Sequence, residues 1–127
     1  MHRFLNKKNI IAVVGASRNL AKYGHTVFVH FLHAGYDVIP INPFERDISG
    51  VDCYDSIEDV PKKIDVVLFI VSPDKTNKIL EKVKELNITK VWFQPGSSDE
   101  KSIQFCKDNN IEYMDGVCVL VSQYKNE

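Results

Sequence analysis

Residues 10–35 read IIAVVGASRNLAKYGHTVFVHFLHAG, which is an apolar run, a loop of small and polar residues, and a segment with helical periodicity. The run Ile10–Val14 has no polar side chain and is rich in β-branched residues, as is typical of a parallel strand covered on both faces. Gly15, Ala16 and Ser17 follow with little side-chain bulk. Bare backbone at the carboxyl end of such a strand lets amide N–H groups approach an anion, and the next helix start adds partial positive charge. The segment therefore predicts a phosphate-binding corner.

Apolar runs and helical patterns alternate along the rest of the chain. Strands are expected at residues 36–41, 64–71, 89–93 and 111–114, a brief edge strand at 52–54, and helices from Gly24, Ser56, Ser72 and Ser97 onward. Ser72 is expected to cap its helix, and Ser97 with Glu100 has the pattern of a capping box. This alternation predicts an α/β fold with a doubly wound, mostly parallel sheet, Rossmann-like, in three α/β/α layers.

Composition limits the classes of protein and partner. A chain of 127 residues, 44% apolar and 26% charged, predicts one globular domain over residues 1–127. The net charge of −1 argues against broad nucleic-acid binding. No secretory signal pattern and no apolar run of ~20 residues is present, so we expect a cytoplasmic protein with no membrane partner. The three cysteines form no C-x-x-C pair, which indicates neither a disulfide framework nor a zinc site.

Ligands of such folds bind outside the carboxyl ends of the strands, where the strand order reverses. The exits here are residues 15–17, 42–43, 71–73 and 94–96. The dinucleotide fingerprint would need glycine where Ser17 and Leu20 stand, and an acidic residue where Asn42 stands. Ordinary NAD binding is therefore disfavoured.

The loop from Gly15 to Gly24 has the chemistry to surround a pyrophosphate. It carries a hydroxyl, two cations and a phenol, on Ser17, Arg18, Lys22 and Tyr23. Beyond Asn42, Arg46 could meet a phosphate on an adenosine ribose, at the 3′ or the 2′ position. The alternative is that these charges are simply solvated. His30 and His33 share a helix face but lack a third ligand, so no metal site is predicted.

Four segments together resemble a known family: VVGAS at 13–17, GYDVIPINP at 35–43, VSP at 71–73 and MDGVC at 114–118. Over about residues 10–121 the chain is similar to the small stand-alone CoA-binding proteins. It is also similar to the N-terminal CoA-binding domain of the succinyl-CoA synthetase α subunit. The resemblance implies that coenzyme A is the cofactor.

The resemblance also implies where each part of CoA would lie. The pyrophosphate would lie on the loop and helix start that include Gly15, Ala16, Ser17, Arg18, Lys22, Tyr23, Gly24 and His25. The adenosine end would lie near Asn42, Pro43 and Arg46. The pantetheine arm would run past Val71, Ser72 and Pro73 and then past Gln94 and Gly96. We expect Gly15→Val to abolish binding and to leave the fold intact.

No catalytic set of residues stands out in the sequence. We therefore expect a protein that binds CoA or an acyl-CoA as a carrier, sensor or accessory subunit, without chemistry of its own. An NADP-dependent oxidoreductase and an interaction module with a decayed nucleotide site stay open as alternatives, as do a protein partner and a homo-oligomer. Cys118 either approaches the CoA thiol and forms a mixed disulfide, or is a small core side chain.

Overall fold

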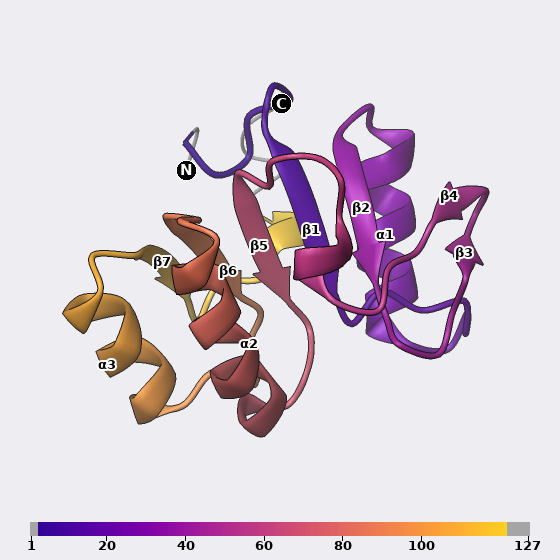
Figure 1. Cartoon of the computed structure of the whole chain (residues 1–127). Helices are drawn as coiled ribbons and strands as arrows, with labels where there is room; N and C mark the ends of the chain where they lie inside the picture. Colours follow the sequence, from indigo (N-terminus) through magenta and orange to yellow (C-terminus); the bar gives the residue numbers. More distant parts are fainter. Residues whose placement is uncertain (1–2, 122–127) are drawn as a thin grey trace.

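Five parallel strands form the central sheet of the structure, a computed structural model that describes residues 3–121 (Figure 1). The strands are β1 (Ile10–Val14), β2 (Asp37–Ile41), β5 (Val66–Phe69), β6 (Lys90–Phe93) and β7 (Glu112–Asp115). They lie in the order β2-β1-β5-β6-β7, and each adjacent pair is parallel. The order reverses between β1 and β5, so the topological switch point lies directly at the end of β1.

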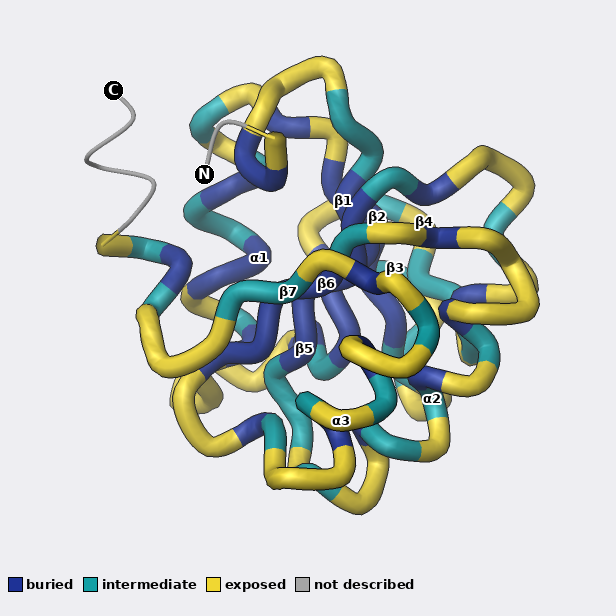
Figure 2. Tube along the Cα trace, turned by 90° about the vertical axis from the view of Figure 1, so that its left-hand side faces the viewer, coloured by how far each residue is buried: buried dark blue, intermediate teal, exposed yellow. Residues whose placement is uncertain are grey.

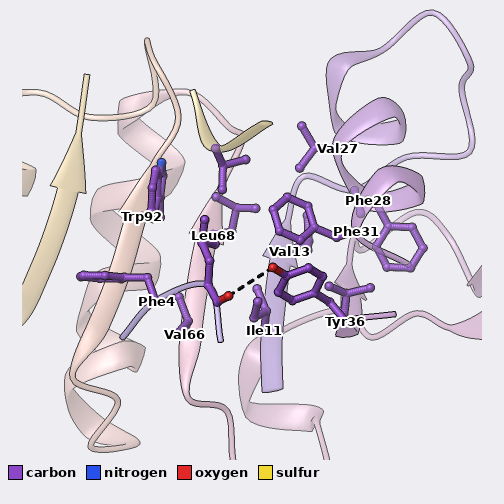
Figure 3. Packing of buried hydrophobic residues seen from close by; sticks show 14 of the residues in the cluster. Phe4, Ile11, Val13, Val27, Phe28, Phe31, Tyr36, Val66, Leu68 and Trp92 are labelled. Atoms are coloured by element: carbon purple, nitrogen blue, oxygen red, sulfur yellow. Dashed lines mark hydrogen bonds between the residues drawn. The ribbon is translucent and has the colours of Figure 1, made fainter. Parts of the chain in front are cut away.

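Helices cover both faces of this sheet, because alternate residues of each strand point to opposite sides. On one face Ile11, Val13 and Leu68 pack with residues of α1 (Tyr23–His33) and with Phe4 from the N-terminal segment (Figure 3). On the other face α2 (Pro73–Glu85), α3 (Glu100–Asp108) and the 3-10 turn η1 (Ile57–Asp59) cover the sheet. The predicted Rossmann-like α/β fold is confirmed.

The strands are buried along most of their length, and exposed residues are concentrated in the loops and on the outer sides of the helices (Figure 2). The edge strand β7 is the exception, since its four residues are exposed or half-buried. Within residues 3–121, no helix has both the length and the apolar character needed to cross a membrane.

Three local predictions need correction. Of the expected single edge strand at 52–54, Tyr54 does pair with Ile41 of β2, but Asp52 belongs to an antiparallel hairpin of β3 (Asp47–Ile48) and β4 (Val51–Asp52). Ser72 occupies the N-cap position of α2, but its side chain makes no capping hydrogen bond. The capping box of α3 is formed by Asp99 and Ser102 rather than by Ser97 and Glu100.

Candidate functional site

Two glycines bring the end of β1, the start of α1 and the end of β5 into close contact. Gly15 has a φ of +101°, and a Cβ atom built on it would lie 2.4 Å from the carbonyl oxygen of Ile70. A Cβ atom on Gly24 would lie 1.9 Å from the carbonyl oxygen of Gly15. Both positions therefore require glycine: one for the turn against β5, the other for the approach of α1 to that turn.

This packing contradicts the expectation that Gly15→Val leaves the fold intact. The expectation assumed that a side chain at position 15 would project into the space of a bound pyrophosphate. The space that a Cβ atom would enter is instead filled by the backbone of Ile70. Substitution of Gly15 therefore disturbs the junction of β1 and β5 itself.

The N-terminus of α1 is not neutralised by side chains. Its N-cap residue, Lys22, is extended and makes no side-chain capping hydrogen bond, and the first turn carries no acidic residue. By contrast, the first turns of α2 and α3 contain Asp74 and Glu100. A helix start with uncapped amides and no nearby carboxylate favours an anion.

The loop between the two glycines folds back onto α1. Ser17 is buried, and its Oγ accepts a hydrogen bond from the amide of Asn19 at 3.0 Å. The Nδ1 atom of His25 lies 2.9 Å from the carbonyl oxygen of Ser17. His25 thus lies at the predicted phosphate loop, and its ring helps to hold the loop against the helix.

The exit of β2 is tied to the exit of β1 through one side chain. The Nδ2 group of Asn42 donates a hydrogen bond to the carbonyl oxygen of Ala16 at 2.8 Å, and its Oδ1 accepts one from the amide of Phe44 at 2.9 Å. Asn42 therefore fixes the geometry between two of the predicted exits. Its neighbour Pro43 is exposed.

Arg18 extends from the β1 exit toward the loop that follows β2. Its guanidinium lies 3.8 Å from a carboxylate oxygen of Glu45 and 3.9 Å from one of Asp47. The Arg18 side chain is 65% exposed, and Arg46 is exposed in the same loop. The structure thus brings two arginines to the β2 end of the site, whereas the sequence assigned Arg18 to the pyrophosphate loop.

The exits of β5 and β6 continue the same edge of the sheet. A Cγ atom of Val71 would lie 3.0 Å from a Cβ atom on Gly15, so Val71 borders the glycine corner. Ser72 is exposed and Pro73 half-buried at the start of α2, while Gly96, with a φ of +87°, turns the chain after β6.

Gln94 differs from these exit residues because it is almost fully buried, with 1% of its surface exposed. Its Oε1 accepts a hydrogen bond from the amide of Val119 at 2.7 Å, and its Nε2 donates to the hydroxyl of Tyr23 at 3.2 Å. The side chain of Gln94 therefore connects the exit of β6 to the start of α1 and to the segment after β7.

Cys118 contacts both Tyr23 and Gln94, and the sequence did not predict these contacts. The hydroxyl of Tyr23 forms a short hydrogen bond with the Sγ atom of Cys118, and Gln94 Nε2 lies 3.6 Å from that sulfur. Cys118 is half-exposed, so the prediction of a small core side chain is wrong. No local signal could pair Tyr23 with Cys118, because 95 positions separate them.

The ionisation of the pair follows from these contacts. Burial and the interaction with Cys118 raise the pKa of Tyr23 to about 12. For Cys118, burial alone would raise the pKa, but hydrogen bonds from Tyr23, Gln94 and the amides of Leu120 and Val121 outweigh it and lower the pKa of the thiol. Both shifts favour a neutral phenol that donates to the sulfur.

Comparison with known proteins identifies the family of the chain. Residues 9–124 match the CoA binding domain family. The chain belongs to that family. The resemblance stated from its sequence motifs is therefore confirmed.

Several relatives of this CoA-binding domain are small proteins of similar length. The uncharacterized protein YneT of Bacillus subtilis is 27% identical over 118 residues, which cover 93% of this chain and 87% of YneT. A conserved hypothetical protein from Pyrococcus furiosus is 38% identical in its solved structure, with a TM-score of 0.86 and coverage of 90% and 98% of the two chains. A hypothetical protein from Pyrococcus horikoshii OT3 is 29% identical, with a TM-score of 0.88 and coverage of 92% and 82%.

Other relatives are enzymes, and this chain matches a small part of each. The α subunit of the ADP-forming acetate–CoA ligase II of Pyrococcus furiosus is 35% identical over 69 residues, which cover 54% of this chain and 15% of that subunit. The similarity thus concerns a region of the ligase rather than the whole enzyme.

Within residues 3–121 of the CoA-binding domain, no group of three histidine, cysteine or acidic side chains is arranged to hold a metal ion. His30 and His33 lie in the last turn of α1, at the end of the helix opposite the site. The residues that converge at the carboxyl edge of the sheet are suited to bind an anion and to hold a polar chain.

Proposed function

We propose that the protein binds coenzyme A, or an acyl-CoA, along the carboxyl edge of the sheet. The observation that carries the proposal is the start of α1, which has no side-chain cap and packs against the glycine turn at the topological switch point. A pyrophosphate is the part of CoA that such a helix start would stabilise. Membership of the CoA-binding domain family supports the choice of ligand.

In this proposal the adenosine end lies near the β2 exit and its 3′-phosphate near Arg46 and Arg18. The ion pairs of Arg18 with Glu45 and Asp47, at 3.8 and 3.9 Å, are longer than the ~2.8 Å of a charge-assisted hydrogen bond. Neither contact is a direct hydrogen bond at these distances, and the Arg18 side chain is largely exposed, so its guanidinium can accept a phosphate. The pantetheine arm then passes Val71 and continues toward Gln94 and Gly96.

We also propose that the protein acts as a carrier, sensor or accessory subunit. Its similarity to the ligase subunit covers 15% of that subunit, so the ligase offers no support for a complete catalytic site on this chain. Three cysteines without a disulfide partner support a reducing compartment, and hence the cytoplasm.

Isothermal titration calorimetry with CoA, dephospho-CoA, NADP and NAD tests the ligand. We expect CoA to bind most tightly and dephospho-CoA about tenfold more weakly, since it lacks the phosphate placed near the arginines. Tighter binding of NADP than of CoA would favour an oxidoreductase. Absence of binding by all four nucleotides would favour an interaction module with a decayed site.

A further inference from the structure

Three side chains from distant segments converge beside the start of α1 at the carboxyl edge of the sheet. Tyr23 comes from the start of α1, Gln94 from the exit of β6 and Cys118 from the segment after β7. The backbone amide of Val119 donates a hydrogen bond to the side-chain oxygen of Gln94, which fixes the Nε2 group of Gln94 toward both the phenol and the sulfur. Cys118 is therefore a positioned thiol within a polar cluster.

The other two thiols of the chain have different surroundings. Burial raises the pKa of Cys53 to about 11 and that of Cys106 to about 12. Cys118 is half-exposed and is the one of the three whose pKa is lowered. Because the thiolate is the reactive form, the exposure and the hydrogen bonds of Cys118 favour reaction there over the other two thiols.

The order of the strands brings this thiol into reach of a bound CoA; this step rests on the proposed function. Cys118 contacts Gln94 at the exit of β6, and two strand spacings of ~4.8 Å separate the ends of β1 and β6, which is a span of ~10 Å. An extended pantetheine arm is about as long as four residues of extended chain, or ~14 Å. From a pyrophosphate at the β1 exit, the pantetheine arm is therefore long enough to bring the sulfur of CoA to Gln94 and Cys118.

We propose that Cys118 is a site of reversible covalent modification, at which the protein exchanges thiols with the disulfide form of coenzyme A. The Cys118 thiolate attacks one sulfur of the CoA disulfide, and a new S–S bond joins that CoA to the protein. The original S–S bond breaks, and the second CoA leaves as a thiolate that takes a proton from water. One disulfide is consumed and one is formed, so no further oxidant is required. The phenol of Tyr23 stabilises the attacking thiolate by donating a hydrogen bond.

Intact-mass spectrometry of the reduced full chain after incubation with CoA disulfide tests the exchange. We expect one CoA per chain, on the peptide that contains Cys118, and its release by dithiothreitol. Cys118→Ser should remain unmodified, while the matched control Cys53→Ser should be modified as the wild type is. An unmodified wild type, or equal modification of Cys53 and Cys118, would overturn the proposal.

The rate of modification shows whether the nucleotide site guides the reaction. The wild type should react at least tenfold faster with CoA disulfide than with hydroxyethyl disulfide at the same concentration, and equal rates would overturn guidance by the site. In Tyr23→Phe the pH profile of the rate should move to higher pH, since the thiolate loses a hydrogen-bond donor. An unmoved profile would overturn the role of Tyr23.

Calorimetry with reduced CoA and Cys118→Ser separates this inference from the proposed function. Cys118→Ser should still bind reduced CoA, because the nucleotide contacts lie at β1 and β2. A wild type that binds reduced CoA but forms no mixed disulfide would overturn the exchange alone. A wild type that binds no reduced CoA would instead overturn the proposed function.

Discussion

The helices α1 and α3 both start at the carboxyl edge of the same sheet, yet their first turns are built in opposite ways. At α3 the Oδ1 atom of Asp99 accepts a hydrogen bond from the amide of Ser102 at 3.1 Å, and the hydroxyl of Ser102 accepts one from the amide of Asp99 at 3.1 Å. Asn77 of α2 donates a further hydrogen bond to Asp99 at 3.1 Å. At α1 the N-cap position holds Lys22, which contributes no capping hydrogen bond.

At the start of α3, side chains of the protein cap the free backbone N–H groups, whereas at the start of α1 no side chain does so. A capped start gains stability whether or not a ligand is present, whereas an uncapped start gains it when an anion arrives. The uncapped start of α1 also contacts the glycine turn at the switch point. One of these two helix starts thus stays open to an anion, whereas the other is already satisfied by the protein.

The largest loss of stability is expected from a side chain placed where α1 contacts the glycine turn. Gly24→Ala places a Cβ atom against the carbonyl oxygen of Gly15, 1.9 Å away before any shift, and should lower the free energy of unfolding by about 2–4 kcal/mol. Urea unfolding measures this change. The control Gly50→Ala has a φ of +81° and open space around the new atom, so its cost should be about 1 kcal/mol. Equal costs at the two positions would contradict the close approach of α1 to the turn.

A second test makes the start of α1 resemble that of α3. Lys22→Asp supplies an N-cap acceptor and an acidic charge, and should raise the free energy of unfolding by about 1 kcal/mol. The same carboxylate would repel a pyrophosphate, so the dissociation constant for CoA should rise at least tenfold in calorimetry. Lys101→Asp, the same charge change in the first turn of α3, should leave CoA affinity unchanged. A similar loss in both variants would mean that the effect is one of net charge.

The converse test removes the cap of α3. Asp99→Ala should lower the melting temperature near pH 7 and leave the affinity for CoA unchanged, because the cap belongs to the other helix start. Hydrogen bonds from Asn77 and from the amide of Ser102 hold the pKa of Asp99 below its usual value. The contribution of Asp99 is therefore complete above the unfolded pKa of ~3.9 and is lost as the pH falls through the lower, folded value. Melting curves of both proteins should converge at low pH, and a difference that persists there would contradict the assignment.

The smallest effect is expected at the β2 exit. Arg46→Gln should weaken CoA binding by about three- to tenfold and leave dephospho-CoA binding unchanged, because an exposed guanidinium contributes about 1 kcal/mol to a phosphate. Calorimetry with both nucleotides measures the two affinities. If the variant loses affinity for both nucleotides equally, Arg46 does not recognise the 3′-phosphate.

The strands and the glycine corner could be predicted because their signals are local. Ile10–Val14 is uniformly apolar, and Gly15 ends it. The hairpin of β3 and β4 was missed although Ser49 and Gly50, with φ of 52° and 81°, form its two-residue turn. Strands of two residues carry no periodicity, so the Ser-Gly pair was the available signal.

Tertiary contacts decided the features that the sequence could not supply. Both Ser97 and Asp99 are suitable N-cap residues, and the choice of Asp99 is reinforced by Asn77 from a different helix. The direction of Arg18 depends on Glu45 and Asp47, which lie more than 25 residues away in the loop after β2 and at the start of β3. Contacts between residues so far apart in the sequence leave no signal in residue spacing or composition.

The mutual packing of Gly15 and Gly24 has a practical consequence for engineering. Because each glycine is fixed by backbone atoms, the eight residues between them form an insert held at both ends by the scaffold. Grafting the corresponding insert from a related protein should therefore alter nucleotide preference while the sheet beneath keeps its geometry. Libraries confined to the exposed positions 18–22 of this insert would explore new ligands on an unchanged framework.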